Sequence, residues 1–436
     1  MVKPLKIALA GLGTVGAGVI RLLEANAELV TARAGRPLQI VSISARDRNR
    51  DRGVDLSAFG WVDNMTLLAD DDSVDVVVEL VGGSDGPALA LARNTLARSK
   101  SLVTANKAMI AHHGMELAAA AEASGSALKF EAAVAGGIPV VKGLREGTAA
   151  NEIEHIYGVL NGTANYILST MEESGADFAT TLSDAQRLGY AEADPTFDVE
   201  GVDAAHKLAI LASIAFGAKT DFEAVACEGI ARVRAADIAQ ADALGYVIRL
   251  IGTADVEANN DGARALLQEV KPCLVPKGHP LSHVTGATNA VVAEGNFSGR
   301  LLFQGAGAGD GPTASAVVAD LIDIARGEAG PAFSVATSEL AALPPAEVGH
   351  RVGQTYLRFT VTDLPGVLAE ITAAMRDAEV SIESLIQQGR ANDGGEVLVA
   401  MVTHHGPERA VAKAVDLLKD SESLTTAPLV MKILDS

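Results

Sequence analysis

Cysteine, aromatic residues and positive charge are all scarce in this chain of 436 residues. Its two cysteines, Cys227 and Cys273, supply neither a disulfide framework nor the paired spacing of a zinc site, so a reducing, cytoplasmic setting is expected. With 35 Lys and Arg against 55 Asp and Glu, the formal net charge of -20 argues against nucleic acid or anionic membrane as a partner. No apolar run reaches the roughly 20 residues needed to cross a bilayer.

Small aliphatic residues and glycine dominate what is present. The hydrophobic content is 48% and the aromatic content only 4%, which is typical of an α/β protein built from parallel strands and covering helices. A length of this size is sufficient for two to four domains with substantial cores. The short apolar run near the N-terminus leads directly into a glycine pattern, which indicates a first strand rather than a signal peptide.

That glycine pattern predicts a dinucleotide site. A short strand over residues 6–10 is followed by G-x-G-x-x-G and then by a helical pattern, the context in which this motif is informative. The first glycine allows a tight turn, the second lets a pyrophosphate approach the backbone, and the third lets helix and strand pack closely. The helix N-terminus then offers N–H groups to the phosphates. The cofactor-binding residues expected here are Gly11, Gly13, Thr14, Val15 and Gly16.

The end of the second expected strand, residues 38–44, bears on the choice of cofactor. An NAD-preferring site usually places a carboxylate there against the ribose 2′-hydroxyl, whereas this chain has Arg46. A guanidinium can hold a 2′-phosphate in a bidentate grip, so the sequence favours NADP. Asp47 keeps NAD use open. For Arg48 and Arg50, a solvated basic loop is an equally good interpretation.

Further alternation of strands and helices predicts a doubly wound sheet. Strands are expected over residues 74–81, 102–104 and 128–134, and helices over residues 87–98 and 108–123. Lys107 falls at the carboxyl end of a strand, where ligands bind in such sheets. Because a positive charge is mildly unfavourable in a first helical turn, a functional role for Lys107 is favoured over a plain surface lysine.

A second group of polar residues lies in the middle of the chain. In the run 185–207 an acid-rich loop precedes a nearly apolar helix that carries Asp203 and Lys207, four residues apart and so on one face. Burial disfavours an ammonium charge and a neighbouring carboxylate favours it, a balance that makes an amine a usable acid–base group. A surface ion pair is the alternative. The block 161–166 either donates to a polar substrate or caps a helix at Thr163.

The spacing in this run carries a family resemblance. The homoserine dehydrogenase signature resembles this run in residue type and spacing, at Gly189, Asp194-Pro195, Asp198, Gly201, Asp203 and Lys207. The blocks 161–166 and 104–107 also resemble that family, and the resemblance covers roughly residues 1–330. It implies NAD(P)H-dependent interconversion of L-aspartate 4-semialdehyde and L-homoserine, a step towards threonine, methionine and isoleucine.

The resemblance also implies roles for single residues. Lys207 would donate the proton to the aldehyde oxygen, Lys107 would assist where cofactor and substrate meet, and Asp203 would act with them. The substrate-binding residues implied are Glu192, Asp203, Gly189 and Asp198. Lys107, Gly189 and Gly307 would also touch the cofactor, Gly307 within the glycine-rich segment 305–313 that precedes a helix over 314–325. A flexible linker is the alternative for that segment.

The resemblance also implies a monovalent cation, with sodium expected, near the interdomain hinge. Its pattern falls on the Glu131 carboxylate and the carbonyls of Val134, Gly136 and Ile138. The residues by themselves are equally consistent with a plain turn.

The C-terminal part predicts a small regulatory module. After a linker over residues 331–352, strands and helices follow in the order βαββαβ and resemble an ACT domain. Its Asp363-Leu364-Pro365-Gly366 turn is of the kind that contributes to an amino-acid site. Threonine feedback through a homodimer or homotetramer is therefore expected, with a purely structural dimerisation domain as the alternative.

The whole chain is thus expected to be α/β, with a Rossmann-type domain, an α+β catalytic and dimerisation domain, and an ACT domain. The boundaries expected are 1–135 completed by 305–330, then 136–304, the linker 331–352, and 353–436. Two other functions stay open from the residues alone. One is a non-catalytic amino-acid sensor on the same fold, and the other is a reductase of a different amino-acid semialdehyde.

Overall fold

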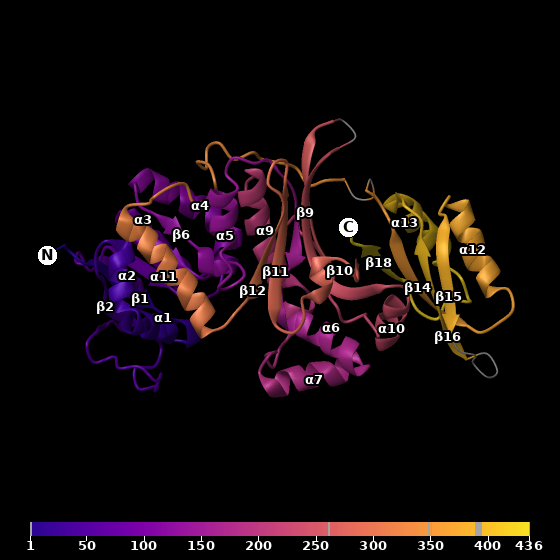
Figure 1. The fold of residues 1–436 in the computed structure, drawn as a ribbon, viewed down its shortest axis with the longest axis horizontal. Helices are drawn as coiled ribbons and strands as arrows, with labels where there is room; N and C mark the ends of the chain where they lie inside the picture. Colours follow the sequence, from indigo (N-terminus) through magenta and orange to yellow (C-terminus); the bar gives the residue numbers. More distant parts are fainter. Residues whose placement is uncertain (1, 260–261, 348, 350, 389–394, 436) are drawn as a thin grey trace.

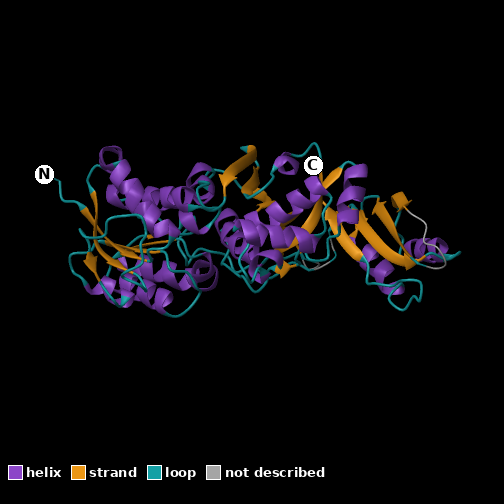
Figure 2. Cartoon of the chain, turned by 90° about the horizontal axis from the view of Figure 1, so that it is seen from below, coloured by secondary structure: helices purple, strands orange, loops and turns teal. Residues whose placement is uncertain are grey.

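The computed structural model describes residues 2–259, 262–347, 349, 351–388 and 395–435. The molecule is elongated, with its N-terminal part at one end, a middle part, and a C-terminal part at the other end (Figure 1). A second view shows strands flanked by helices in the first two parts (Figure 2). The mixed α/β class expected from composition is confirmed.

The N-terminal part is a parallel sheet of six strands in the order β3-β2-β1-β4-β5-β6. The strands are β1 (Leu5–Ala10), β2 (Leu38–Ser44), β3 (Gly60–Trp61), β4 (Val76–Glu79), β5 (Ser101–Thr104) and β6 (Leu128–Lys129). This is the strand order of a dinucleotide-binding sheet, so the ligand crevice is expected beyond the carboxyl ends of the strands.

Helices cover both faces of this sheet. One core cluster joins alternate β1 residues such as Ile7 and Leu9 to α1 (Thr14–Ala25) and α11 (Asp310–Arg326). The intervening residues Ala8 and Ala10 belong to the core on the other face, with side chains of α3 (Pro87–Ala97) and α4 (Lys107–Ser124). The remaining helix, α2 (Ala27–Ala34), also contacts α11. The period-2 alternation of a strand therefore accounts for both cores.

Two element boundaries differ from the sequence prediction by several residues, whereas the strand expected over 74–81 is shorter by two residues at each end. The strand expected over 128–134 stops at Lys129, and Glu131–Ala133 forms a 3₁₀ helix instead. The backbone N–H of Glu131 donates to Asp320 Oδ2 at 2.9 Å, so it is not available to a neighbouring strand. The helix expected from residue 314 begins earlier, at Asp310, with Pro312 in its first turn, a position that tolerates a residue without an N–H.

The middle and C-terminal parts share one ten-stranded sheet. Its order is β12-β11-β7-β9-β10-β18-β14-β16-β15, with β8 paired to β10. The middle strands are β7 (Ile153–Val159), β8 (Ala226–Cys227), β9 (Tyr246–Ala258), β10 (Arg264–Pro276), β11 (Thr288–Gly295) and β12 (Gly299–Ala306). The middle helices are α5 (Val140–Lys142), α6 (Gly162–Ser174), α7 (Phe178–Leu188), α8 (Thr196–Val199), α9 (Val202–Phe216) and α10 (Ala235–Ala243).

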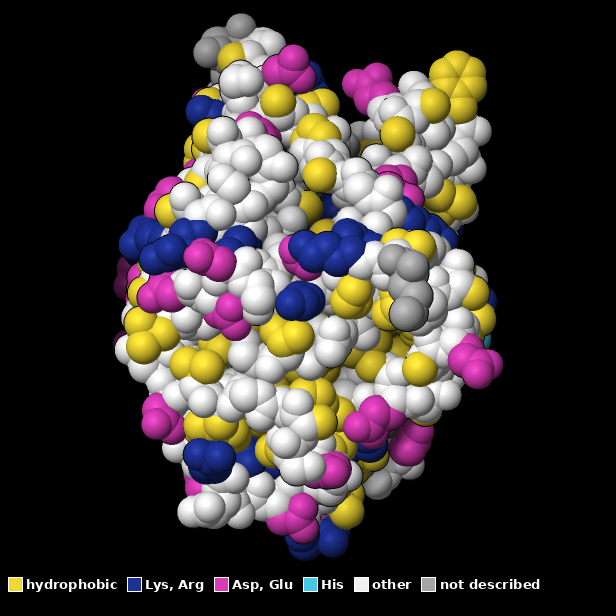
Figure 3. All heavy atoms as spheres, turned by 90° about the vertical axis from the view of Figure 1, so that its left-hand side faces the viewer, with side chains coloured by type: hydrophobic (Ala, Val, Ile, Leu, Met, Phe, Trp, Pro, Cys, Tyr) yellow, Lys and Arg dark blue, Asp and Glu magenta, His cyan; other side chains and the backbone are white. Residues whose placement is uncertain are grey.

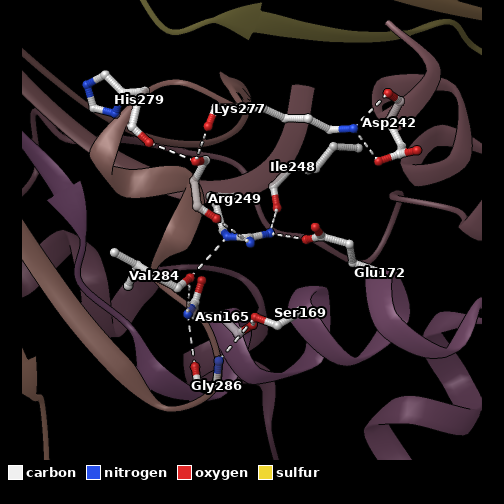
Figure 4. A network of polar contacts seen from close by, with 11 residues as sticks. Asn165, Ser169, Glu172, Asp242, Ile248, Arg249, Lys277, His279, Val284 and Gly286 are labelled. Carbon is white, nitrogen blue, oxygen red and sulfur yellow. Dashed lines mark hydrogen bonds and ion pairs between the residues drawn. The ribbon is translucent and has the colours of Figure 1, made fainter. Parts of the chain in front are cut away.

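A buried arginine ties α6 to this sheet (Figure 4). Arg249 of β9 donates to the carbonyls of Ser282 and Val284 and pairs with Glu172 of α6 at 2.7 Å. Asn165 of α6 also donates to the Val284 carbonyl, at 3.1 Å. Because each of the three guanidinium nitrogens has an acceptor, the Arg249 charge is tolerated in the interior.

The C-terminal part has the βαββαβ order expected from the sequence. Its elements are β14 (Thr355–Thr362), α12 (Val367–Asp377), β15 (Ile382–Gln388), β16 (Glu396–Thr403), α13 (Glu408–Leu417) and β18 (Leu429–Ile433), with β13 (Val352–Gly353) and β17 (Gly406–Pro407) as a small separate pair. Strand β18 pairs with β14 and, in parallel, with β10 of the middle part. The C-terminal strand therefore joins the strands of the middle part to those of the C-terminal part within one sheet.

The segment before β13 is held in place by the middle part. Leu266 of β10 donates to the Pro344 carbonyl at 2.8 Å and accepts from Ala346 at 3.0 Å. Lys219 donates to the Ala341 carbonyl at 2.9 Å. The proline-containing segment is irregular, as expected, but it is attached to β10 rather than loosely tethered.

The surface at the N-terminal end of the molecule carries charges of both signs (Figure 3). At the end of the molecule formed by the N-terminal part, Lys and Arg side chains lie among Asp and Glu side chains (Figure 3). Within the described ranges, no helix combines the length and apolar character that a membrane span requires.

Candidate active site

Helix α9 presents the central carboxylate and amine. Gly201 enters the helix at φ +83°, where a β-carbon would come within 3.0 Å of Cys227 Sγ and Val270 Cγ1. Lys207 Nζ donates to Asp203 Oδ2 at 2.7 Å and to the carbonyl of Leu160 at 2.7 Å. Only 10% of the Lys207 side chain and 7% of the Asp203 side chain are exposed. The pair is therefore buried, and the surface ion pair that its spacing also allowed is excluded.

A second lysine reaches the same carboxylate from the N-terminal part. Lys107 is the first residue of α4, just beyond the carboxyl end of β5. Its Nζ lies 3.0 Å from Asp203 Oδ1 and 5.9 Å from the ring centre of Phe197. One third of the side chain is exposed. The carboxylate of Asp203 thus joins amines from two separate parts of the fold.

The two lysines determine the charge state of Asp203. Burial alone would raise the pKa of this carboxyl, but the adjacent ammonium groups of Lys207 and Lys107 and the hydrogen bonds it accepts hold the pKa below its ordinary value. Asp203 is therefore ionised at neutral pH and serves as a fixed negative charge between two cations.

Asn161 caps a helix and also donates to two carboxylates of the site. Its Oδ1 accepts from Ala164 N at 2.7 Å and caps α6, so the cap is Asn161 and not Thr163. Its Nδ2 donates to Asp203 Oδ2 at 2.8 Å and to Asp198 Oδ1 at 2.7 Å. Thr163 instead donates to the Tyr190 carbonyl at 2.9 Å. One amide therefore aligns a helix and two carboxylates.

Asn289 is a site residue that the sequence analysis missed. Its Nδ2 donates at 2.9 Å to the Leu160 carbonyl, the group that also accepts from Lys207. A β-carbon at Gly307 would lie only 2.2 Å from the Asn289 side chain, so the glycine segment crosses directly over it. A β-carbon at Gly136 would in turn meet the Gly307 carbonyl at 2.6 Å. The predicted residues Gly136 and Gly307 therefore lie together, beside a side chain in contact with the Lys207 acceptor.

The other predicted substrate residues lie at the rim. Asp198 is half-buried, and burial followed by the charge of Asp203 raises its pKa. Gly189 ends α7 at φ +79° and is exposed. Glu192 is also exposed; its backbone carbonyl accepts from Gln186, and among the described residues no hydrogen bond or ion pair involves its carboxylate. The structure thus brings Asp198 to the cluster but leaves Glu192 out of contact with it.

The glycine motif fits a dinucleotide. A β-carbon at Gly11 would lie 2.6 Å from the Leu80 carbonyl oxygen, and one at Gly16 would lie 2.1 Å from the Gly11 oxygen. At Gly13 no atom lies within 4 Å of the same position. The first and third glycines are therefore required by packing, whereas the second faces open space where a pyrophosphate can approach.

A buried glutamate shapes the neighbouring crevice loop. Glu79, at the end of β4, is fully buried, accepts from Val81 N at 2.7 Å and Gly82 N at 3.1 Å, and accepts from Thr104 Oγ1 at 2.6 Å. It thereby links the ends of β4 and β5 just before Lys107. Its place at the end of an apolar strand was the only sequence signal for it.

The expected cation region has an unusual backbone. Ala135 and Gly136 both have positive φ, 55° and 59°, a conformation that a residue with a β-carbon rarely adopts outside functional turns. Both carboxylate oxygens of Glu131 accept backbone N–H groups, from Val141 at 3.0 Å and Lys142 at 2.8 Å. Burial, with the nearby charge of Asp320, raises the pKa of Glu131 to about 7.

Comparison with known proteins gives consistent matches along the chain. Residues 139–322 match the family model described as homoserine dehydrogenase, 11–131 match its NAD binding domain, and 355–420 match the ACT domain. A homoserine dehydrogenase of Mycobacterium tuberculosis is 42% identical over 434 residues, covering 99% of this chain and 98% of that protein.

Solved structures agree. The crystal structure of a homoserine dehydrogenase from Thiobacillus denitrificans has a TM-score of 0.92 at 41% identity and covers 99% of both chains. A hyperthermophilic archaeal homoserine dehydrogenase in complex with NADPH has a TM-score of 0.62 at 26% identity, covering 74% of this chain and 97% of that chain.

Proposed function

The chain belongs to the homoserine dehydrogenase family, and we propose that Lys207, Lys107 and Asp203 form its catalytic centre. It is an NAD(P)-dependent oxidoreductase that converts L-aspartate 4-semialdehyde to L-homoserine, in the biosynthesis of threonine, methionine and isoleucine. A non-catalytic sensor, or a reductase of another semialdehyde, is not favoured by these matches.

The observation that carries the proposed mechanism is the buried ammonium of Lys207. Two of its three N–H groups are directed at Leu160 and Asp203, and among the described residues it has no further acceptor. The third N–H is available to the aldehyde oxygen, which gains negative charge during reduction. A bound nicotinamide supplies the hydride. Lys207 then transfers its proton to the new alkoxide, while Asp203 holds the amine in place.

The remaining residues are assigned to substrate binding and to the junction between the N-terminal and middle parts. Lys107 lies at the junction of the N-terminal and middle parts and can contact both cofactor and substrate. Asp203 and Asp198 offer negative charge to the substrate ammonium. Glu192 and Gly189, on the exposed loop after α7, would join them only if this loop moves onto the bound substrate.

Replacement of the proposed proton donor tests this mechanism. Lys207→Ala should lower kcat by two to four orders of magnitude, roughly the contribution of a positioned acid, while leaving NADPH affinity nearly unchanged. The assay follows nicotinamide absorbance with L-aspartate 4-semialdehyde. Lys219→Ala, a lysine just after the same helix, is the matched control. Near-normal turnover of Lys207→Ala would remove this residue from the mechanism.

We propose NADP as the preferred cofactor, bound by Gly11, Gly13, Thr14, Val15, Gly16, Lys107, Gly189 and Gly307. Arg46 follows β2 and is exposed at the carboxyl edge of the sheet, where a guanidinium can pair with a 2′-phosphate. The NADPH complex of the archaeal relative supports this choice. Asp47 remains compatible with some use of NAD.

We also propose a monovalent cation, sodium by preference, held by the Glu131 carboxylate and the carbonyls of Val134, Gly136 and Ile138. Oxygen ligands suit such a hard cation. Among the described residues no group of three His, Cys, Asp or Glu forms a metal site, so carbonyl oxygens of the loop with positive φ would have to complete the coordination.

Sodium binding is measurable without turnover. Sodium chloride should raise the melting temperature by a few degrees relative to N-methyl-D-glucamine chloride at equal ionic strength, because a cation that binds only the folded state stabilises it. Glu131→Gln should abolish the difference. An equal melting temperature in both salts for the natural chain would contradict the proposal.

We also propose that the C-terminal part binds an amino-acid effector and pairs with a second chain. An ACT domain implies an amino-acid ligand, and threonine, a product of the pathway, is proposed as the inhibitor that binds near the Asp363–Gly366 turn. Leu364 and Leu368 are exposed beside this turn, which suits pairing of two chains as a homodimer or homotetramer. The expected domain boundaries and the cytoplasmic location stay predictions.

A further inference from the structure

The loop after β2 contains four arginines, and one of them is already engaged. Arg52 Nε donates to the Leu12 carbonyl at 2.9 Å, and its terminal nitrogens donate to the carbonyls of Arg50, at 2.6 Å, and Asp47. A single guanidinium therefore joins the glycine turn to a loop forty residues later in the chain. It uses the several donors of its planar fork, which a lysine does not have.

The bond to Leu12 fixes the orientation of a group that faces the cofactor. Because a peptide unit is planar and trans, directing the Leu12 carbonyl towards Arg52 directs the Gly13 N–H the opposite way. Gly13 faces open space, and in this motif that space belongs to the pyrophosphate. Arg52 thus orients a donor at the pyrophosphate site without occupying it.

The other two bonds order the loop that carries Arg46. Asp47 Oδ1 accepts from Asn49 N at 2.8 Å and Asp51 Oδ1 accepts from Gly53 N at 2.9 Å, so the loop is a series of short turns. Arg52 spans them by bonding the Asp47 and Arg50 carbonyls. An ordered loop loses less conformational entropy when a phosphate binds to it.

The single tryptophan of the chain lies against the same loop. The guanidinium carbons of Arg48 and Arg52 lie 5.7 Å and 6.0 Å from the ring centre of Trp61 on β3. This is the range of a cation–π contact. The ring therefore supports the loop from β3 and provides a fluorescent probe of it.

We propose that Arg52 is a positioning residue that sets the spacing between the pyrophosphate site and the 2′-phosphate site, and so contributes to discrimination between NADPH and NADH. The proposal rests on the NADP preference assigned above to Arg46. The loss of Arg52 should differ in its effect from the loss of a residue that contacts the phosphate directly. Loss of Arg52 weakens the binding of both cofactors through Gly13. It weakens the binding of NADPH further, because Arg46 is no longer held at the 2′-phosphate site.

Kinetics with both cofactors test this role in the full chain. Arg52→Ala should raise KM for NADPH about tenfold and KM for NADH about threefold, with kcat nearly unchanged. Arg52→Lys keeps the charge but not the fork, and should resemble Arg52→Ala. Arg50→Ala is the matched control, because among the described residues no side-chain hydrogen bond or ion pair involves Arg50; its KM values should stay within about twofold.

Titration of Trp61 fluorescence with each cofactor gives the same comparison as dissociation constants, without turnover. Partial unfolding alone would lower apparent kcat for both cofactors and would leave the ratio of KM values unchanged. Unaltered KM values in Arg52→Ala, or full recovery in Arg52→Lys, would overturn the role of Arg52. Equal use of both cofactors by the natural chain and by Arg46→Ala would instead refute the NADP preference. In that case the weaker binding of both cofactors by Arg52→Ala, through Gly13, would still be measurable.

Discussion

Asp203 shows how much of this site depends on one carboxylate. Each of its oxygens faces a different lysine, one from α9 and one from α4. Removal of the charge would leave two ammonium groups close together with no counter-ion in a largely buried setting, which is strongly unfavourable. The same contact ties the N-terminal part to the middle part, so a single residue combines electrostatic and positional roles.

His206, next to Lys207, predicts a pH dependence of stability. It is buried, stacks on Phe222 with ring centres 4.2 Å apart, and has its Nε2 3.2 Å from that of His112. Burial, followed by the charges of His112 and Lys107, lowers the pKa of His206 to about 4, with Asp203 opposing. Between this value and its ordinary 6.5 the unfolded chain binds the extra proton, so stability is lost as pH falls through this window.

The loss from this group between pH 7.5 and pH 5 should be about 2 kcal/mol. Urea unfolding at the two pH values would measure it against His206→Phe, which keeps a ring against Phe222 and cannot titrate. The variant should lose less stability than the natural chain over this interval. An identical loss in both proteins would show that His206 is not responsible.

Residue spacing could predict some of this site but not all of it. The interval of four between Asp203 and Lys207 places both on one helix face, and the apolar remainder of α9 correctly indicates burial. Asn289 could not be found in this way, because it lies 129 residues from the carbonyl it binds and has no motif around it. Glu192 was predicted from family resemblance alone, and its side chain is exposed; its role stays a prediction.

At the scale of elements, the C-terminal part is attached to α10 by a buried ion pair. Arg358 Nε of β14 lies 2.9 Å from Asp237 Oδ1, and the side chains are 3% and 0% exposed. The hydroxyl of Tyr356 donates to the same carboxylate at 3.2 Å. Asp237 also accepts from the backbone N–H of Arg234 at the start of α10. This contact therefore fixes strand and helix together.

Arg358→Met should destabilise the protein by about 3–5 kcal/mol, because the Asp237 carboxylate stays buried without its cation. The double variant Arg358→Met with Asp237→Asn should recover a large part of that loss, since no uncompensated charge remains. Urea unfolding of the three proteins measures both effects. A single variant as stable as the natural chain would show that the pair carries no net stabilisation.

Element types were more predictable than element ends. The strand expected over 38–44 has the bounds of β2, whereas the strand expected over 128–134 was too long. Apolar periodicity could not reveal that the backbone N–H of Glu131 is taken by Asp320, a partner 189 residues away. Pairing of β18 with β10 was equally hidden, because both strands have the same pattern whether or not they are neighbours.

At the scale of the whole molecule, that pairing changes how regulation has to be tested. Strand β18 pairs with β10 at Cys273 and Leu274, and Leu434 N donates to the Leu274 carbonyl at 2.8 Å. Lys432 of β18 also pairs with Glu269 of β10 and with Glu408 Oε1. The C-terminal strand is thus part of the same sheet as the strands of the middle part. A movement of β18 on effector binding would therefore displace β10.

A chain ending after Glu347 should therefore lose most of its basal turnover and tend to aggregate, because β10 is left without a partner strand at Cys273 and Leu274 and Glu269 keeps Lys271 but loses Lys432. Asp363→Ala in the full chain leaves β18 in place. It should keep basal turnover and raise the threonine concentration for half-inhibition about tenfold, as expected for loss of one charge-assisted contact. Threonine titration and size-exclusion elution of the three proteins measure these outcomes. A truncated chain as active and as soluble as the full one would show that β18 is dispensable to the catalytic sheet, and unchanged inhibition of Asp363→Ala would place the effector away from this turn.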